Sequence, residues 1–346
     1  MRNFNYLRFP RLAICPESSS REASNERPER RPRGPRGSSG WERILGRNRS
    51  NDDDLASLTE SSKISSIEDA RRRVYRRSQP TADVLAYLSE EPIRGKLLEL
   101  PCGDGQTTSK LLELGYDVTP ADLFPESFRL HEPKAVKVDM LETLPFPDGS
   151  FNYVLCQEGI EHIQAPLRFT QECGRVLRTG GKLMITTPNV LNMSARFSYF
   201  LVGQRTLRRG LMDEYFTLQE RRGDDLAHGH AWHWRYHLLR YILRLSGFKV
   251  HKPLCGKYSW VSVLLSVPFY PVLYWAHRRA IRSMLAKQRG RRSSDLVERA
   301  AMAYEEILDH SLSRGVLWGK KLILVAEKEE IGFLDAEEEK GEVLPS

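Results

Sequence analysis

The chain has 346 residues, a length that suits one large domain or one domain with appendages. Its hydrophobic content of 40% and charged content of 28% are ordinary for a globular protein. The net charge of +8 is unevenly placed, because residues 1–50 contain 12 Arg and 5 Glu, which leaves residues 51–346 nearly neutral. The total charge is therefore no evidence for nucleic-acid binding by the folded part, and we expect no nucleic-acid partner.

The cysteines have no C-x-x-C spacing, which excludes the usual sequence pattern of a structural zinc site. We expect reduced thiols in a cytoplasmic protein rather than a disulfide framework. The five are Cys15, Cys102, Cys156, Cys173 and Cys255.

Residues 1–60 are predicted to be a disordered basic leader. The segment 28–40 (PERRPRGPRGSSG) has too little apolar surface to form a core. The first sixteen residues lack the continuous apolar run of a secretory signal, and a basic transit peptide is the alternative. Residues 61–95 are predicted to hold two helices, at 64–77 and 81–90.

Residues 96–254 are predicted to form the core domain, because short apolar runs alternate with helical patterns there. This alternation indicates an α/β fold with a doubly wound, mostly parallel sheet. Strands are expected at 97–100, 117–121, 135–138, 151–156 and 182–187, with helices at 106–114 and 166–177. Helices at 191–203 and 236–245 and a strand at 248–254 follow. A helical insertion at 255–319 precedes a last strand at 320–328, and residues 320–346 end in an acidic tail.

The segment KLLELPCGDGQ is the most informative part of the core. A buried strand ends at Glu99, a tight turn contains Gly103 and Gly105, and a helix begins at Gln106. Glycines allow a sharp turn and a close approach of the backbone to a ligand. The start of the helix offers unpaired N–H groups, and Glu99 can accept hydrogen bonds from ribose hydroxyls. The pattern therefore predicts a nucleoside-binding turn.

Two kinds of nucleoside site are compatible with such a turn. A dinucleotide site requires G-x-G-x-x-G or G-x-G-x-x-A, but the frame that starts at Gly103 ends in Thr108. An S-adenosylmethionine site has no phosphate to bind and needs acidic or polar groups instead. Glu99, Asp122, Asp139 and Gln157 all follow strands, and the carboxyl ends of parallel strands form one crevice.

Residues 81–190 resemble a class I S-adenosylmethionine-dependent methyltransferase of the small-molecule type-11 family. ELPCGDG is similar to the family motif E/D-x-G-x-G-x-G, with Pro101 in place of the first glycine. LPFPDGSFNYV resembles the family stretch L-P-F-x-D-x-S-F-D-x-V, with Asn152 in place of Asp. QEGIEHI and VLRTGGK match the later motifs in the same order.

The resemblance implies a seven-stranded Rossmann-like sheet and S-adenosyl-L-methionine as the methyl donor. It also implies that Asp122 binds the ribose hydroxyls and that Asp139, with Met140 beside it, faces the adenine. A fold of this type that has lost its cofactor is the alternative. The predicted cofactor-binding residues are Glu99, Pro101, Cys102, Gly103, Gly105, Asp122, Leu123, Asp139, Met140 and Gln157.

His162 is the candidate catalytic base, because it follows the fourth strand and a neutral imidazole accepts protons near pH 7. The alternative is that Glu161 and His162 only pack and orient the loop. A second histidine-rich stretch, HGHAWHWRYH, contains His228, His230, His233 and His237. We expect no metal there, because no cysteine accompanies them, and predict a cap over the substrate with Trp232 and Trp234 as walls.

The segment 260–276 (WVSVLLSVPFYPVLYWA) is the most apolar run, and it is too short for a typical membrane span. Pro268 and Pro271 are predicted to break it. Because Arg and Lys follow it, residues 258–292 are a candidate surface for an anionic membrane. A core hairpin or a dimer contact are the alternatives.

We therefore predict a methyltransferase that acts on an oxygen, nitrogen or carbon of a small-molecule or lipid- or glycan-linked acceptor. Its expected location is the cytoplasm, with the inner face of a membrane as the second option. One alternative is an RNA or protein methyltransferase recruited by the basic leader. A non-catalytic membrane-associated scaffold and a nicotinamide oxidoreductase are the others.

Overall fold

The computed structural model describes residues 82–203, 218–222, 225–228 and 232–330, without the side chains of 218–222 and 225–228. All described residues belong to one compact unit, within residues 66–346. The predicted leader and the predicted helix at 64–77 lie outside the described residues. The helix predicted at 81–90 is α3, Ala82–Glu90.

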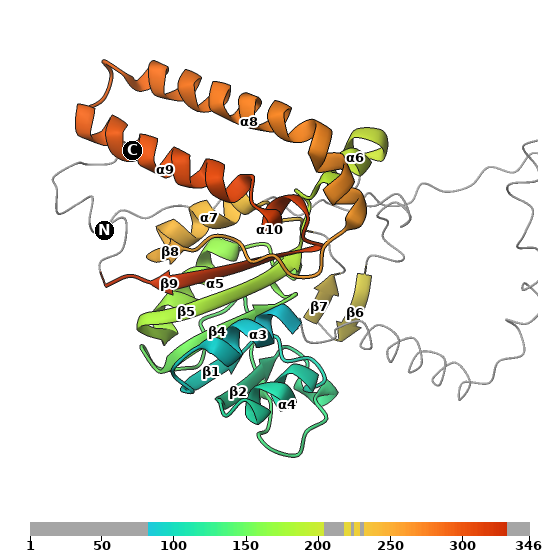
Figure 1. The fold of residues 1–346 in the computed structure, drawn as a ribbon. Coiled ribbons are helices and arrows are strands. Elements are labelled where there is room, and N and C mark those ends of the chain that lie inside the picture. The colour runs from blue at the N-terminus through green and yellow to red at the C-terminus, as the bar shows by residue number, and fades with distance from the viewer. Residues whose placement is uncertain (1–81, 204–217, 223–224, 229–231, 331–346) are drawn as a thin grey trace, which may run out of the picture. The chain divides into compact units, whose positions relative to one another are not determined.

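Seven strands form one sheet in the order β3-β2-β1-β4-β5-β9-β8 (Figure 1). The pairs among β1 to β5 are parallel, whereas β9 is antiparallel to both β5 and β8. The predicted α/β fold with a mostly parallel, seven-stranded sheet is thereby confirmed. The strands are β1 Lys96–Glu99, β2 Asp117–Asp122, β3 Val136–Lys137, β4 Phe151–Gln157, β5 Leu177–Pro188, β8 Phe248–Val250 and β9 Lys321–Lys328.

Helices cover both faces of this sheet, which is why its central strands are apolar on both sides. Helices α5 (Pro166–Val176) and α7 (Tyr236–Leu245) bury Phe169 and Tyr236 in one core cluster. Helices α3 and α4 (Gln106–Glu113) bury Leu88 and Leu111 in a second cluster. Strand β1 contributes to both clusters, because Leu97 and Leu98 point to opposite faces.

Several element boundaries differ from the predicted ones. Strand β3 keeps two residues and β8 three, and β5 begins at Leu177, so residues 178–181, between the predicted helix and the predicted strand, belong to this strand. Helix α6 spans Met193–Val202, with the Asn192 side chain accepting a hydrogen bond from the N–H of Ala195 at its start. A two-stranded antiparallel hairpin of β6 (Leu218–Arg222) and β7 (Asp225–His228) lies between α6 and α7 in the sequence, where no strand was predicted.

The insertion between β8 and β9 consists of α8 (Trp260–Gln288), α9 (Ser294–Ser311) and α10 (Arg314–Leu317). The prediction that Pro268 and Pro271 break the apolar run is wrong, since both lie inside α8. Figure 1 shows a bend within α8, which is the usual effect of proline in a helix. No helix in the described part of the chain is long and apolar enough to cross a membrane.

Candidate active site

The turn between β1 and α4 is built by two glycines with left-handed backbone angles, Gly103 (φ 55°) and Gly105 (φ 88°). The N–H of Gly103 donates to Oδ2 of Asp122 at 2.9 Å, and the N–H of Cys102 donates to the carbonyl of Ala121 at 2.9 Å. A Cβ at Gly105 would lie 2.9 Å from a ring carbon of Phe128. The turn is therefore fixed against the end of β2, and Gly105 is required by both its backbone angle and this close approach.

Asp122, at the end of β2, is oriented by two backbone donors. Oδ2 accepts from Gly103, and Oδ1 accepts from the N–H of Phe124 at 2.9 Å. The N–H of Val138 donates to the Asp122 carbonyl at 2.9 Å, which brings the end of β3 to the same place. Beyond it, Oδ1 of Asp139 accepts from the N–H of Leu141 at 2.8 Å. The two acids expected to bind ribose and adenine thus follow neighbouring parallel strands, at the carboxyl end of the sheet.

Glu99 is placed differently from what its position at the end of β1 indicated. Its side chain is 1% exposed, and Oε2 accepts from the Thr108 hydroxyl at 2.5 Å. Burial raises the pKa of this carboxyl to about 8, and the charges of Asp122 and Asp104 act in the same direction. Glu99 therefore supports the turn from beneath, and its burial disfavours the direct contact with ribose hydroxyls that the sequence indicated.

The acids around the turn make its surroundings unsuited to a pyrophosphate. Asp104 is buried and accepts from the backbone and the side chain of Gln106. Among the described residues, no Lys or Arg forms an ion pair with Glu99, Asp104 or Asp122. A cationic nucleoside suits this charge pattern better than a dinucleotide does.

Gln157 ends β4, the strand next to β1. Its side chain is 9% exposed, and its Oε1 is buried without a hydrogen-bond partner among the described residues. Buried amide oxygens are nearly always paired, so an orphaned one at the carboxyl end of a strand is a site for a donor from a ligand. This observation agrees with the prediction that Gln157 lines the crevice.

The segment after β4 packs tightly against the glycine turn. A Cβ at Gly159 would lie 2.4 Å from Cδ of Pro101, so only glycine fits there without a shift. Glu158 has a left-handed φ of 52°, and its Oε1 accepts from the Thr186 hydroxyl at 3.1 Å and lies 3.5 Å from Nζ of Lys321. Strained angles at non-glycine residues cluster at functional sites.

Glu161 and His162 lie in the short 3-10 helix η2, Ile160–His162. Glu161 is fully buried, and its Oε2 accepts from the Thr187 hydroxyl at 3.0 Å. Burial, with the nearby charge of Glu158, raises its pKa above the ordinary range, and its Oε1 has no partner among the described residues. His162 is half-buried at the end of η2. The candidate base therefore stands at the sheet edge that carries Asp122 and Gln157.

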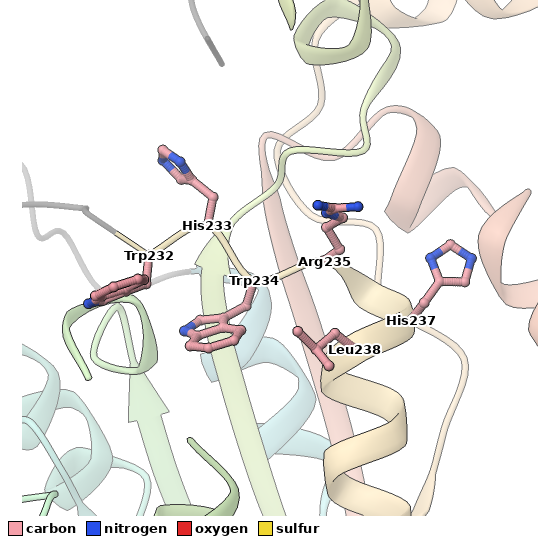
Figure 2. A pocket seen from close by; sticks show the side chains of 6 residues that line it. All are labelled: Trp232, His233, Trp234, Arg235, His237 and Leu238. Atoms are coloured by element: carbon pink, nitrogen blue, oxygen red, sulfur yellow. The ribbon is translucent and has the colours of Figure 1, made fainter. Parts of the chain in front are cut away.

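A hollow of about 450 Å³ lies beside η2 and is shown in Figure 2. The indole rings of Trp232 and Trp234 lie on one side of their segment, whereas His233 points to the other. Nε1 of Trp234 donates to the carbonyl of Ile160 at 2.8 Å, and the N–H of Trp232 donates to the carbonyl of Glu161 at 3.2 Å. Arg235, His237 and Leu238 complete the lining. The tryptophans predicted as substrate walls thus do line a hollow, fixed to the segment after β4.

The histidine-rich stretch does not gather its side chains in the described part. The hydroxyl of Tyr199 in α6 lies 3.5 Å from Nδ1 of His233, whereas Nε2 of His237 lies 3.0 Å from the Ser311 hydroxyl in α9. The described residues contain no group of three potential metal ligands. The side chains of His228 and His230 lie outside the described residues.

Three residues near the turn were not predicted to support it; two of them, Asp104 and Thr108, are buried, and Phe128 is half-buried. Asp104, Thr108 and Phe128 hold the turn or close over it, through the contacts given above. The spacing of Thr108, nine residues after Glu99, was visible but carries no specific pattern. Tyr199, which connects α6 to the tryptophan segment, had no local signal at all.

Residues 98–185 match the family model described as a methyltransferase domain. The chain is 33% identical over 136 residues to a ubiquinone biosynthesis O-methyltransferase from Xanthomonas axonopodis pv. citri, which covers 36% of this chain and 56% of that protein. It is 35% identical over 123 residues to the Xanthomonas oryzae pv. oryzae protein of the same name. That match covers 33% of this chain and 51% of the relative. The chain thus spans about half the length of these curated relatives.

Solved structures resemble the chain only distantly. A SAM dependent methyltransferase from Archaeoglobus fulgidus has a TM-score of 0.41 and 14% identity, with 76% of this chain and 94% of that chain covered.

Proposed function

We propose that the protein is a class I S-adenosylmethionine-dependent methyltransferase that transfers a methyl group from that cofactor to a small-molecule acceptor, and the match of residues 98–185 to a methyltransferase-domain model supports this. The observation that carries the proposal is the turn at Gly103 and Gly105, which is held by the carboxylate of Asp122 and has Asp104 beside it. An adenosyl sulfonium cation is complementary to such a charge pattern, and a pyrophosphate is not.

The residues at the sheet edge fit the parts of this cofactor. Asp122 and the neighbouring Leu123 would hold the ribose, and Asp139 with Met140 would hold the adenine. Gly103 and Gly105, with Pro101 and Cys102 between β1 and the glycines, would let the backbone approach the amino acid moiety. Gln157 offers its unpaired Oε1 to a donor of the ligand. Glu99 would not contact the cofactor but would stabilise the turn through its hydrogen bond with Thr108.

The bound cofactor would supply an activated methyl group, so the protein has to position the acceptor and exclude water. The hollow beside η2 suits the first task, because two indoles give it flat apolar walls and Arg235 gives it a cation. His162 is our candidate for the proton acceptor where the acceptor atom loses a proton during transfer. The burial of Glu161 disfavours its use as that base, since its carboxyl has no route to solvent.

The names of the curated relatives concern an O-methylation in ubiquinone biosynthesis, and they support an acceptor that carries a hydroxyl group. We propose a small molecule, free or linked to a lipid, as the acceptor. The apolar lining by Trp232, Trp234 and Leu238 agrees with this class.

Calorimetric titration of the full chain with S-adenosylmethionine, S-adenosylhomocysteine and NADH tests the proposal. We expect micromolar affinity for the two adenosyl ligands alone. Asp122→Ala should weaken that binding by about 10- to 100-fold, because hydrogen bonds to a charged group contribute about 1.5–3 kcal/mol. Asp148→Ala is the matched control, since Asp148 is 80% exposed and pairs with Arg175 on the surface.

Equal losses in the two variants would refute the assignment of Asp122. Binding of NADH alone would replace the methyltransferase proposal with an oxidoreductase. Absence of binding by all three ligands would favour a non-catalytic scaffold with this fold.

A further inference from the structure

Helix α8 packs against the rest of the protein with its polar side. Its buried residues are Ser262 and Ser266. The Ser262 hydroxyl accepts from the N–H of Ser194 at 3.1 Å, and the Ser266 hydroxyl accepts from Nε1 of Trp318 at 2.7 Å. A surface helix in water normally turns its apolar stripe to the core and its polar side outward. Helix α8 shows the opposite arrangement.

The outward side of α8 is apolar and aromatic. Val267 is 74% exposed, Leu264 70%, Trp260 69% and Trp275 64%. Trp260, Leu264 and Val267 lie along one stripe, whereas the further exposed apolar side chains, Val261, Phe269, Tyr270 and Val272, lie beside it on other sides of the helix, at about 100° per residue. A single helical partner would cover only the stripe, so this distribution favours a fluid apolar surrounding over one helical partner.

Helix α6 extends this surface. Its Phe200 is 83% exposed, and Phe197, Leu201 and Val202 are exposed beside it. Figure 1 shows α6 next to the first turns of α8, and the contact between Ser194 and Ser262 joins the two helices. The two helices together expose a cluster of large apolar side chains, and such clusters on a protein surface usually mark an interaction site. We call it the α6–α8 surface.

The second half of α8 carries the positive charges. The helix contains no Asp or Glu, and cations follow its apolar half at Arg278, Arg279, Arg282 and Lys287, with Arg289, Arg291 and Arg292 directly after its end. At the boundary, Arg278 lies over the Tyr274 ring at 5.4 Å and Arg279 lies over the Trp275 ring at 5.7 Å. Glu305 of α9 pairs with Arg278. Aromatic rings and cations at the edge of an apolar zone are typical of helices at a lipid–water interface.

We propose that the α6–α8 surface docks on a membrane that contains anionic phospholipids. The apolar half of α8 and the phenylalanines of α6 enter the interfacial region, and the cations of the second half of α8 bind the headgroups. The helix lies on the bilayer and does not cross it, in agreement with its composition.

The docking surface lies close to the hollow of the candidate site. Phe200 is on the outer side of α6, and the preceding residue, Tyr199, contacts His233 of the hollow. Docking would therefore bring a lipid-linked acceptor close to the segment that carries the two tryptophans. This second step rests on the proposed function, whereas the docking itself does not.

Flotation of the full chain with vesicles tests the docking without cofactor or acceptor. One vesicle set contains phosphatidylcholine alone, and the other also contains phosphatidylglycerol. We expect the protein to float with the anionic vesicles and to be released by high salt. Combining Leu264→Ser, Val267→Ser and Trp275→Ser should lower the apparent lipid affinity by about a hundredfold, because each side chain contributes about fivefold through its buried apolar area.

Two further variants separate charge from apolar contact. Combining Arg279→Gln, Arg282→Gln and Arg292→Gln should lower affinity for anionic vesicles by about a hundredfold, at about fivefold per cation. The matched control combines Ile93→Ser, Leu141→Ser and Tyr241→Ser, which change exposed apolar residues outside α6 and α8 and should leave flotation unchanged. The melting temperature of each variant reports folding, and titration with S-adenosylmethionine reports the cofactor site independently.

Failure of the folded wild-type chain to float would overturn the proposal. Equal flotation with both vesicle sets would overturn the role of the cations. A concentration-dependent dimer that the serine variant dissociates, without flotation, would assign the surface to a second copy of the chain. Flotation without cofactor binding would retain the docking and refute the proposed function.

Discussion

Replacement of Glu99 by glutamine should change how the stability of the protein depends on pH. The Glu99 carboxyl is 1% exposed, and burial raises its pKa to about 8 from an ordinary value of 4.5. Between these two values the folded protein holds a proton that the unfolded chain has released. The contribution of Glu99 to the free energy of unfolding therefore falls as the pH rises from about 4.5 to 8, and this contribution changes no further above that.

The magnitude follows from the separation of the two pKa values. Each pH unit between them is equivalent to about 1.4 kcal/mol, so an ionised Glu99 destabilises the fold by up to ~5 kcal/mol at pH 9. Glutamine resembles the neutral acid in shape and can still accept the hydrogen bond from Thr108. We expect Glu99→Gln to match the wild type near pH 5 and to be several kcal/mol more stable at pH 9.

Urea denaturation of both proteins at several pH values between 5 and 9 measures this difference. Glu113→Gln is the matched control, because it makes the same substitution on the exposed side of α4, where Glu113 pairs with Lys110. Its difference from the wild type should stay constant over the whole range. Parallel stability curves for Glu99→Gln and the wild type would refute the conclusion that Glu99 is neutral in the folded protein.

Two other substitutions test contacts around the site. Gly159→Ala should destabilise the protein by about 1–3 kcal/mol and weaken cofactor binding, because the new Cβ would lie 2.4 Å from Cδ of Pro101 and displace the glycine turn. Unchanged stability and affinity would contradict this packing. Asn189→Ala should lower the free energy of unfolding, measured by urea denaturation, by about 2–3 kcal/mol. The Asn189 amide is 1% exposed and donates to the carbonyls of Gly315, Val316 and Gly319. A loss below about 0.5 kcal/mol would indicate that water replaces these hydrogen bonds.

The core strands were predictable because each is a short apolar run with a turn or an acid at its end. Strand β4 matches its prediction within one residue, since Phe151 and all of Tyr153 to Cys156 are suited to burial. The carboxyl-end positions of Asp122, Asp139 and Gln157 followed from the parallel order alone. Neighbouring parallel strands place their ends together whatever their other contacts are.

The parts that were not predictable depend on contacts between distant segments. Glu99 and Asp122 both end strands, but the sequence does not reveal that Thr108 covers one and leaves the other half-exposed. Hairpin β6–β7 is polar and has no alternating pattern to identify it. Helix α8 continues through two prolines, which local helix propensity does not predict. Whether a helix tolerates them depends on its packing against other parts of the chain, such as α9.

The position of β9 has a consequence for the synthesis of the protein. This strand comes from the end of the described chain, yet it lies between β5 and β8 and pairs with seven residues of β5. While the ribosome is still making α8 to α10, β5 has a long, apolar, unpaired edge. We expect the nascent chain to depend on chaperones during this interval, and a premature stop before Lys321 to yield an aggregating fragment rather than a smaller working enzyme.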